Sequence, residues 1–371
     1  MKDLNLILIL IDSGRQDYMI KSEMIGKLSS KFSFFTNVIT YAPHTIASMH
    51  AIFSGCYGNR TGTNSYWSTF KFKKNKFKTL AEYLHELGFK TYADVHSDIV
   101  SPKQGFNQFR IYDEETVDIT TRHCDLLNEV SNEGEKFFAY LHYSKIHTGI
   151  KNEVLKKYTN FSEDYYKNLK LNEKRYERLF NESENYLNKI LETICSLELE
   201  KNSIILIMSD HGISIGEKIG EIAYGAFCYD YTLKTLSLIK FPEITPIQIN
   251  QQIRSIDMMP TILDILDIQV DKQFDELDGR TLMPLILGNN MDEEIAYSET
   301  GNPLNEKRPP REPNTMSVRT SKWKFIHNVH NNTKELYDLE NDPSETKNLF
   351  GTNLDIENYL WEKLENIRNN F

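Results

Sequence analysis

Cysteine is scarce in this sequence, and the few cysteines do not pair. The 371 residues include four cysteines with no Cys-x-x-Cys spacing among them, namely Cys56, Cys124, Cys195 and Cys228. This pattern excludes a disulfide framework. We expect each cysteine to be a small buried hydrophobic residue.

Long apolar runs are also absent. The longest, residues 4–11, is well below the roughly 18 residues that a membrane span needs, and Asp12 closes it. It lacks the basic flank and the small-residue cleavage site of a signal peptide. The sequence therefore predicts no membrane span and, together with the unpaired cysteines, a cytoplasmic protein.

Positive charge is in the minority. The chain has 43 Lys and Arg against 53 Asp and Glu, a net charge of −10. Proteins that bind nucleic acid generally hold the phosphate backbone with an excess of Lys and Arg, so the balance excludes a general nucleic-acid binder. Hydrophobic residues make up 40% of the chain, which is enough for a sizeable core and argues against disorder.

Short apolar runs alternate with amphipathic segments along most of the chain. The runs read as strands at 6–11, 34–38, 90–93, 136–141, 203–208 and 236–240, and the amphipathic segments as helices at 79–87, 120–130 and 175–197. This alternation predicts an α/β fold with a mostly parallel sheet sandwiched by helices. Such sheets carry their sites at the carboxyl ends of the strands.

The pattern changes near Gly288. Short strands are predicted at 294–299, 317–319 and 323–327, and a closing helix at 355–371, with a proline-rich loop at 302–313. We therefore predict a catalytic α/β domain over 1–288 and a small C-terminal α+β subdomain over 289–371.

Three segments carry residues suited to chemistry. Asp12 ends the first predicted strand, where a carboxylate either caps the next segment or ligates a hard metal ion. Asp210 and His211 end the strand at 203–208 and offer an oxygen and a nitrogen ligand, or else form a polar turn before Gly212. Thr45 precedes a helix for which Ser48 is the predicted N-cap. It is either a cap itself or a nucleophile in the field of the helix N-terminus.

In this order and spacing, the segments resemble the sulfatase family of the alkaline phosphatase superfamily. The resemblance covers nearly the whole chain: residues 6–12, the nucleophile helix at 45–55 with the turn at 58–62, 87–91, 105–106, 137–147, 209–212, 256–282 and 318–349. It implies an alkaline phosphatase-like fold, one divalent metal ion held by Asp12, Asp210 and His211, and a substrate-binding histidine at His147.

The nucleophile position departs from the sulfatase pattern. Sulfatases of this family carry Cys-x-Pro-Ser-Arg, whose cysteine is oxidised to formylglycine. Counting back ten residues from Gly55 places Thr45 there, without the motif's Cys, Pro or Arg. A hydrated aldehyde has one hydroxyl to attack and one to expel sulfate, whereas threonine has a single hydroxyl. A phosphothreonine intermediate is familiar in related phosphatases, so the sequence favours a phosphate or phosphonate ester over a sulfate ester.

Further candidates follow from the resemblance. Thr45 would attack the ester and His147 would contact its oxygens or protonate the leaving group, unless His147 is an ordinary loop residue. His96 matches loosely a position that carries a histidine in the family and is a substrate-binding candidate. Arg15 and Lys145 are secondary candidates for anion contact, and Lys234 is a weaker one.

The expected identity and number of metal ions also depend on two departures from the family pattern. Ser13 replaces the second aspartate of many members, so the site is less anionic and zinc, manganese and magnesium stand open beside calcium. Between residues 216 and 230, where some relatives carry an additional histidine, this chain has none. We therefore predict a single metal ion.

Two other functions remain open from the sequence. One is a phosphoglycerol- or phosphoethanolamine-type transferase acting on a glycan precursor, and the other is a catalytically silent binding protein with the sulfatase fold. The expected partner is a small-molecule or glycan ester, recognised through loops at 66–78, 143–166 and 302–313. In the first of these, Tyr66, Trp67 and Phe70 lie among lysines, either as a rim for a sugar phosphate or as an ordinary exposed loop. The sequence does not determine the oligomeric state.

Overall fold

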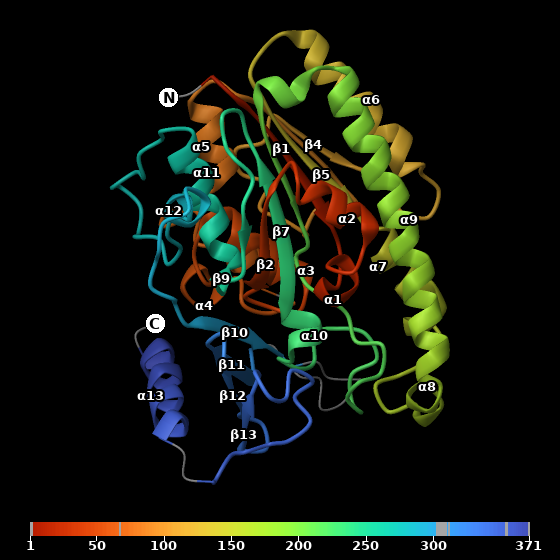
Figure 1. Ribbon diagram of the computed structural model, residues 1–371, viewed down its shortest axis with the longest axis vertical. Helices are drawn as coiled ribbons and strands as arrows, with labels where there is room; N and C mark the ends of the chain where they lie inside the picture. Colours follow the sequence, from red (N-terminus) through yellow and green to blue (C-terminus); the bar gives the residue numbers. More distant parts are fainter. Residues whose placement is uncertain (1–2, 67, 302–309, 311, 353–354, 370–371) are drawn as a thin grey trace.

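The computed structural model describes residues 3–66, 68–301, 310, 312–352 and 355–369. It contains a large central sheet flanked by helices and a smaller sheet near the C-terminal end of the chain (Figure 1). Within the described residues, no helix combines the length and the apolar character that crossing a membrane requires.

The larger sheet is mostly parallel, as the sequence predicts. Among the described residues its strands follow the order β4-β3-β5-β1-β6-β7-β2-β8, with β9 pairing to β2. β7 runs antiparallel to both of its neighbours, and the other pairs are parallel. The strands are β1 (Asn5–Ile11), β2 (Ser33–Ile39), β3 (Lys90–Val95), β4 (Gln108–Ile111), β5 (Phe137–Tyr143), β6 (Ser203–Met208), β7 (Lys234–Lys240), β8 (Gln248–Ile249) and β9 (Ile253–Arg254).

The helices connect these strands and cover both faces of the sheet. They are α1 (Gln16–Met19), α2 (Glu23–Leu28), α3 (Thr45–Ser54), α4 (Gly58–Thr61), α5 (Leu80–Glu86), α6 (Ile119–Glu133), α7 (Lys145–Ile150), α8 (Glu163–Lys167), α9 (Leu169–Ser196), α10 (Asp230–Leu233), α11 (Met258–Ile265), α12 (Met283–Ile286) and α13 (Asp355–Asn369). Single turns of tighter or wider helix lie at Thr69–Lys71, Lys151–Leu155, Leu199–Lys201 and Ser255–Asp257.

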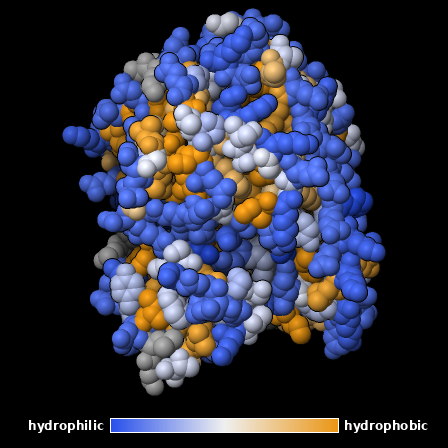
Figure 2. All heavy atoms as spheres, in the orientation of Figure 1, coloured by the Kyte–Doolittle hydropathy of each residue, from blue (hydrophilic) through white to orange (hydrophobic). Residues whose placement is uncertain are grey.

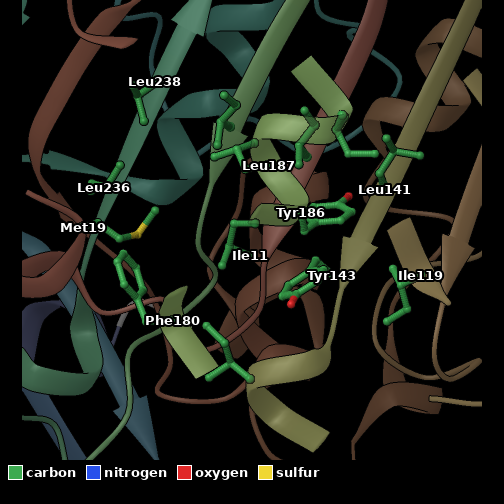
Figure 3. Close-up of a cluster of buried hydrophobic side chains, with 14 of the residues drawn as sticks. Ile11, Met19, Ile119, Leu141, Tyr143, Phe180, Tyr186, Leu187, Leu236 and Leu238 are labelled. Carbon is green, nitrogen blue, oxygen red and sulfur yellow. The ribbon is translucent and has the colours of Figure 1, made fainter. Parts of the chain in front are cut away.

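The near-continuous apolar run of β1 is explained by burial on both faces. Successive side chains of a strand point to opposite sides. Leu6, Leu8 and Leu10 lie in a core cluster with residues of α3, α5 and α11. Ile7, Ile9 and Ile11 lie in a second cluster with residues of α6 and α9. The sheet is therefore sandwiched between two helical layers, and Figure 3 shows part of the second cluster.

Helix α9 covers one of these faces over 28 residues. Its predicted apolar stripe faces the core, where Tyr186 and Leu187 lie beside the strand residues Ile11 and Leu141 (Figure 3). The outward face of this helix is hydrophilic (Figure 2). The helix begins six residues before the predicted start, because the pattern of buried residues extends back to Asn172.

The smaller sheet is antiparallel, in the order β10-β11-β12-β13. Its strands are β10 (Ala296–Thr300), β11 (Thr315–Arg319), β12 (Trp323–Asn328) and β13 (Thr333–Asp338), of which the last was not predicted. Helix α13 packs on it through Leu360 and Leu364, which share a core cluster with Val318 and Phe325. A small C-terminal α+β unit is thus present, while the division at residue 288 stays a prediction. Most of the proline-rich loop at 302–313 lies outside the described residues, as do Trp67 and the last two residues of the closing helix.

The prediction for the cysteines is correct for Cys56 and Cys228, which are buried, and wrong for Cys195, which is exposed on α9. Cys124 is partly buried. The four thiols are free, so no disulfide links them. Cys195 lies near the end of an amphipathic helix, where a single step along the chain moves a side chain from the core face to solvent.

The helix that follows Thr45 starts earlier than the sequence predicts. Thr45 is its first residue and His44 is the N-cap, with its Nδ1 accepting a hydrogen bond from the Ala47 amide at 3.5 Å. Ser48 is therefore inside α3, and its Oγ donates to the Asp210 carbonyl at 2.8 Å. The prediction failed because capping statistics favour Ser over His. The predicted end is confirmed, since Gly55 closes the helix with φ 63°.

Candidate active site

The site residues meet where three parallel strands end. Asp12 directly follows β1, and Asp210 lies two residues beyond β6. In the central sheet, Leu10 of β1 is opposite His142 of β5 on one side and Met208 of β6 on the other. Because neighbouring parallel strands end at one edge, their following residues come together.

Asp12 is fully buried and held on both oxygens. Ser13 Oγ donates to Oδ1 at 2.8 Å, and His142 Nε2 lies 3.0 Å from Oδ2. Burial acts to raise the pKa of Asp12, but the hydrogen bond with His142 and the charges of His147, His142 and His211 outweigh it, and the pKa is lowered. The carboxylate is therefore held ionised. Ser13 adopts φ 63°, a left-handed conformation that is uncommon outside glycine.

Only one of the two carboxylate oxygens of Asp210 has hydrogen-bond partners among the described residues. Its Oδ1 accepts hydrogen bonds from the backbone amides of Ser13 at 3.2 Å and His211 at 2.9 Å. Its Oδ2 is buried and has no hydrogen-bond partner among the described residues. Burial and the neighbouring charge of Asp12 raise the pKa of Asp210. A buried carboxylate oxygen without a donor is costly for the protein alone.

His211 is oriented by its own backbone. Its Nδ1 lies 2.7 Å from the carbonyl oxygen of Gly212, and since a carbonyl can only accept, Nδ1 carries the hydrogen. In the neutral ring, Nε2 then presents its lone pair, 3.5 Å from Asp210 Oδ2. Gly212 is required here by space: a Cβ on it would lie 2.2 Å from the Tyr231 carbonyl oxygen.

Thr45 faces these groups from the N-terminus of α3. Its Oγ1 lies 3.2 Å from His211 Nε2 and 3.4 Å from Asp12 Oδ2. The residue is buried, with 8% of its surface exposed. The partial positive charge of the helix N-terminus favours an alkoxide or a bound anion at this point.

These residues fit a divalent cation. Asp12, Asp210 and His211 each offer a ligand atom, and the three atoms lie within 4.8 Å of one another. Two carboxylates and an unprotonated imidazole nitrogen suit several divalent ions. The unpartnered Oδ2 of Asp210 is the observation that favours a bound cation, which would satisfy it.

Other histidines lie beside this cluster. His96 packs edge-to-face on His142, with ring centroids 4.8 Å apart, and stacks on His147 at 5.4 Å. The Tyr224 hydroxyl lies 3.2 Å from His147 Nδ1 and its ring packs against His211. The structure thus brings the sequence candidates His96 and His147 to the same end of the sheet as Thr45.

Two of the three basic candidates already have protein partners. The Arg15 guanidinium is buried and bonded to Asp17, Glu217 and the Ile213 carbonyl. Lys145 Nζ donates to the Glu114 carbonyl at 2.8 Å. Lys234, the weakest candidate, is partly buried and lines a cavity of about 360 Å³ together with Arg15 and Asp17. The geometry does not favour direct anion contact by Arg15, and the roles of Arg15 and Lys145 in substrate binding stay predictions.

Sequence reasoning missed His142, Glu114, Tyr224 and His44 as members of this region. His142 carried a usable signal, because it nearly ends a strand adjacent to the one that delivers Asp12. Glu114 lies in a loop and His44 looks like an unremarkable polar residue, so neither has a pattern that local sequence could reveal. His44 is buried, and burial together with the charge of His211 lowers its pKa to about 3.

Comparison with known proteins gives two matching family models. One, described as Sulfatase, matches residues 4–268, and the other, described as N-sulphoglucosamine sulphohydrolase, C-terminal, matches residues 224–370.

Curated relatives match part of the chain. It is 25% identical over 186 residues to a choline-sulfatase of Rhizobium meliloti, covering 48% of this chain and 34% of that protein. It is 28% identical over 169 residues to a delta 4,5-hexuronate-2-O-sulfatase of Bacteroides thetaiotaomicron, covering 44% of this chain and 34% of that protein. The match thus spans about a third of the length of these relatives.

Solved structures match over nearly the whole chain. A phosphonate monoester hydrolase of Agrobacterium radiobacter has a TM-score of 0.79 at 14% identity, covering 99% of this chain and 96% of that one. A protein solved in complex with its substrate D-glucosamine-2-N,6-O-disulfate has a TM-score of 0.76 at 17% identity, covering 99% and 98%. At such identities the likeness shows the shared fold.

Proposed function

The chain belongs to the sulfatase family, and from this membership and the geometry at Thr45 we propose that it is a metal-dependent hydrolase that cleaves a phosphate or phosphonate ester. The observation that carries the proposal is the Thr45 hydroxyl, which lies at the N-terminus of α3 within 3.2 Å of His211 and 3.4 Å of Asp12. Its position among the carboxylates and the histidine at the strand ends supports a role as the nucleophile.

The residues around Thr45 suit attack on a tetrahedral ester centre. Asp12, ionised and buried, accepts a hydrogen bond from the hydroxyl at 3.4 Å and orients it. When bound by Asp12, Asp210 and His211, a divalent ion would lower the pKa of a hydroxyl beside it and neutralise charge on the ester oxygens. The backbone amides at the start of α3 favour the same developing negative charge.

The reaction balances over two displacements. In the first, Thr45 Oγ1 bonds to phosphorus and gives up its proton, the bond to the leaving oxygen breaks, and that oxygen takes up one proton, so no proton is gained or lost overall. In the second, water attacks the phosphothreonine, releasing phosphate or phosphonate and restoring the hydroxyl. His147 is our candidate for contact with the leaving oxygen, since the Tyr224 hydroxyl at 3.2 Å from its Nδ1 steadies the ring.

The preference for phosphorus over sulfur rests on the missing cysteine. Cys56 is buried against Phe72 and Phe77, and its Sγ lies 3.7 Å from the Glu276 carbonyl, away from the cluster around Thr45. Burial raises the pKa of the Cys56 thiol to about 12, so it is an inert structural thiol. Threonine, with one hydroxyl, cannot expel sulfate in the manner of a hydrated aldehyde.

The names of the relatives support a proposal for the substrate class. The curated matches are named for choline sulfate and for a sulfated hexuronate, and one structural neighbour is named for phosphonate monoesters. We propose a small-molecule or glycan ester for this chain. Transfer to a second alcohol in place of water would use the same first displacement, so it is the alternative that product analysis must separate.

The test compares matched phosphate, phosphonate and sulfate esters with added zinc, manganese, magnesium or calcium. We expect the phosphorus esters to be cleaved faster than the sulfate ester, and a phosphoryl group to be trapped on Thr45 by rapid quench and peptide mass spectrometry. Thr45→Ala should lower kcat/KM by at least about 10³-fold, the scale on which loss of an activated nucleophile is felt. Thr45→Ser should retain part of the activity, and Thr333→Ala, at an exposed residue of β13, should retain all of it.

Full activity in Thr45→Ala would disprove the covalent mechanism. A faster rate with the sulfate ester would overturn the preference for phosphorus. Product formed on an added alcohol at the expense of free phosphate would favour transfer, and no cleavage with any ester or ion would favour a silent binding protein.

A further inference from the structure

A second group of ligand atoms lies beside the first. His96, Glu114 and His147 each offer a nitrogen or oxygen, and these atoms lie within 4.8 Å of one another. His96 directly follows β3, Glu114 is in the loop after β4, and His147 is in the first turn of α7. The chain therefore brings them together from three separate segments at one edge of the sheet.

We propose that His96, Glu114 and His147 bind a second divalent cation, adjacent to the one assigned to Asp12, Asp210 and His211. Two imidazoles and one carboxylate form the donor set of many catalytic zinc sites that keep an open position for water or substrate. Zinc is therefore the first ion to test, with manganese and cobalt as substitutes. The inference rests on the proposed function and deepens it, because His147 would then act on the leaving oxygen through the bound ion rather than by direct contact.

The rings of His96 and His147 are placed so that each can offer a nitrogen to a cation. His96 Nδ1 is buried and has no hydrogen-bond partner among the described residues. Tyr224 Oη, 3.2 Å from His147 Nδ1, fixes the ring and leaves Nε2 for a ligand. Such outer partners typically orient metal-bound histidines. The stacking of the His96 ring on the His147 ring, at 5.4 Å, holds the two side by side.

Glu114 supplies the negative charge of this group. Its Oε2 accepts from Thr148 Oγ1 at 3.0 Å, and its Oε1 pairs with Lys151 Nζ. A carboxylate has about four lone-pair positions, so these contacts leave room for a cation. Lys151 competes with that cation for the same charge. Its removal should therefore strengthen metal binding.

The two donor sets are linked by Asp12 and His142. His142 Nε2 lies 3.0 Å from Asp12 Oδ2, while the His142 ring packs on His96 at 4.8 Å. Two ions on either side of this pair could act on opposite sides of one ester centre, the arrangement that many phosphoryl-transfer enzymes use. The sequence predicts one ion because it lacks a histidine between residues 216 and 230. The structure offers donors from β3 and β4 instead, on the other side of β1.

The experiment counts ions in the purified protein. After chelation and re-addition of zinc, elemental analysis and equilibrium titration should give two ions per chain. His96→Ala, Glu114→Gln and His147→Ala should each reduce the count to one. Asp210→Asn should also reduce it to one, through the other site. His85→Ala, which removes an exposed histidine of α5, should leave two.

Two further variants serve as tests that do not depend on removing a ligand. Lys151→Met should tighten the weaker of the two binding steps several-fold. Tyr224→Phe should loosen it by about 10-fold, the lower end of the effect of an outer partner. Cobalt absorption bands should change in the His96→Ala protein and not in His85→Ala. Circular dichroism confirms that each variant is folded.

A single zinc ion in the wild type, or two ions in all three ligand variants, would overturn the proposal. Direct contact of His96 and His147 with the ester would then be the alternative to test. The ion count is independent of the identity of the substrate. Two ions without phosphorus-ester cleavage would sink the proposed function alone, and cleavage with one ion would sink the second site alone.

Discussion

Two groups of buried charges in this molecule are built in opposite ways. At the ends of β1 and β6, the carboxylates of Asp12 and Asp210 lie among histidines, and one oxygen of Asp210 has no donor within the described chain. Beside β11 and β12, Asp230 is paired with Lys324 Nζ at 2.8 Å and with Arg319 Nη2 at 2.8 Å.

In the second group, side chains of the protein itself balance the buried charges. Lys324 has no exposed surface, and its ammonium lies 2.9 Å from Glu345 in addition to Asp230. The first group would need a cation from solution to reach the same balance. Burial of charge alone therefore does not identify a functional site. A buried carboxylate that lacks a counter-charge from the protein is the more informative sign. Four predictions test this contrast.

The largest effect is expected in the first group, around Asp12 and Asp210. His211→Gln removes a ligand atom and the nearest contact of Thr45, so kcat/KM should fall by at least about 10³-fold. Steady-state kinetics with the best phosphorus ester measures the loss. His85→Gln, at an exposed histidine, is the control. Activity within a few-fold of the wild type for His211→Gln would show that the group around Asp12 and Asp210 is not catalytic.

The second group, around Asp230 and Lys324, should control the stability of the fold. Lys324→Met leaves Asp230 and Glu345 with less compensation in a buried place and should lower the free energy of unfolding by about 3–5 kcal/mol. Urea unfolding followed by circular dichroism measures the change. Lys322→Met, at an exposed lysine nearby, should stay within about 0.5 kcal/mol. An unchanged midpoint for Lys324→Met would contradict a structural role.

Glu221 tests a third arrangement, a buried carboxyl with neutral donors. It accepts hydrogen bonds from the amides of Ala226 and Phe227 and from the Tyr231 hydroxyl, and burial raises its pKa to about 7. Because the folded pKa lies above the unfolded one, its stabilising contribution is complete below about pH 4.5 and is lost as the pH rises through about 7. The loss amounts to about 3 kcal/mol when complete.

Urea unfolding of wild type and Glu221→Gln between pH 4.5 and 8 measures this contribution. The difference between the two proteins should vary with pH across that window, while the difference between wild type and Glu340→Gln, at an exposed position, should stay flat. A flat difference for Glu221→Gln would show that the carboxyl is ionised throughout.

The smallest effect is expected for Asp210→Asn in chelator. Without a bound cation, replacing one of two neighbouring carboxylates removes repulsion and should raise the free energy of unfolding by about 1 kcal/mol. Thermal unfolding with and without chelator measures it. The sign should reverse when zinc is present, because the wild type then gains binding energy that the variant lacks. A lower Tm for the variant in chelator would mean that Asp210 is structural, like Asp230.

Local sequence was a good guide wherever burial imposes a strong pattern. The strand over Ser203–Met208 is found at its predicted residues, and the apolar stripe of α9 faces the core. The strands β4, β8 and β9 escaped prediction because they have only two to four residues, too few to show alternation. His44 as an N-cap was missed because its side chain contradicts the usual preference at that position.

The family resemblance, the α/β class and the positions of Asp12, Thr45, Asp210 and His211 at the ends of secondary-structure elements could be read from the amino-acid sequence. The folded chain was needed to find that these side chains lie within 4.8 Å or hydrogen-bonding reach of one another, that Arg15 is bonded to two carboxylates, and that Glu114 joins His96 and His147. The reason is physical. Periodicity and capping are properties of neighbouring residues, whereas counter-charges and ligand sets depend on which distant segments the sheet order brings side by side.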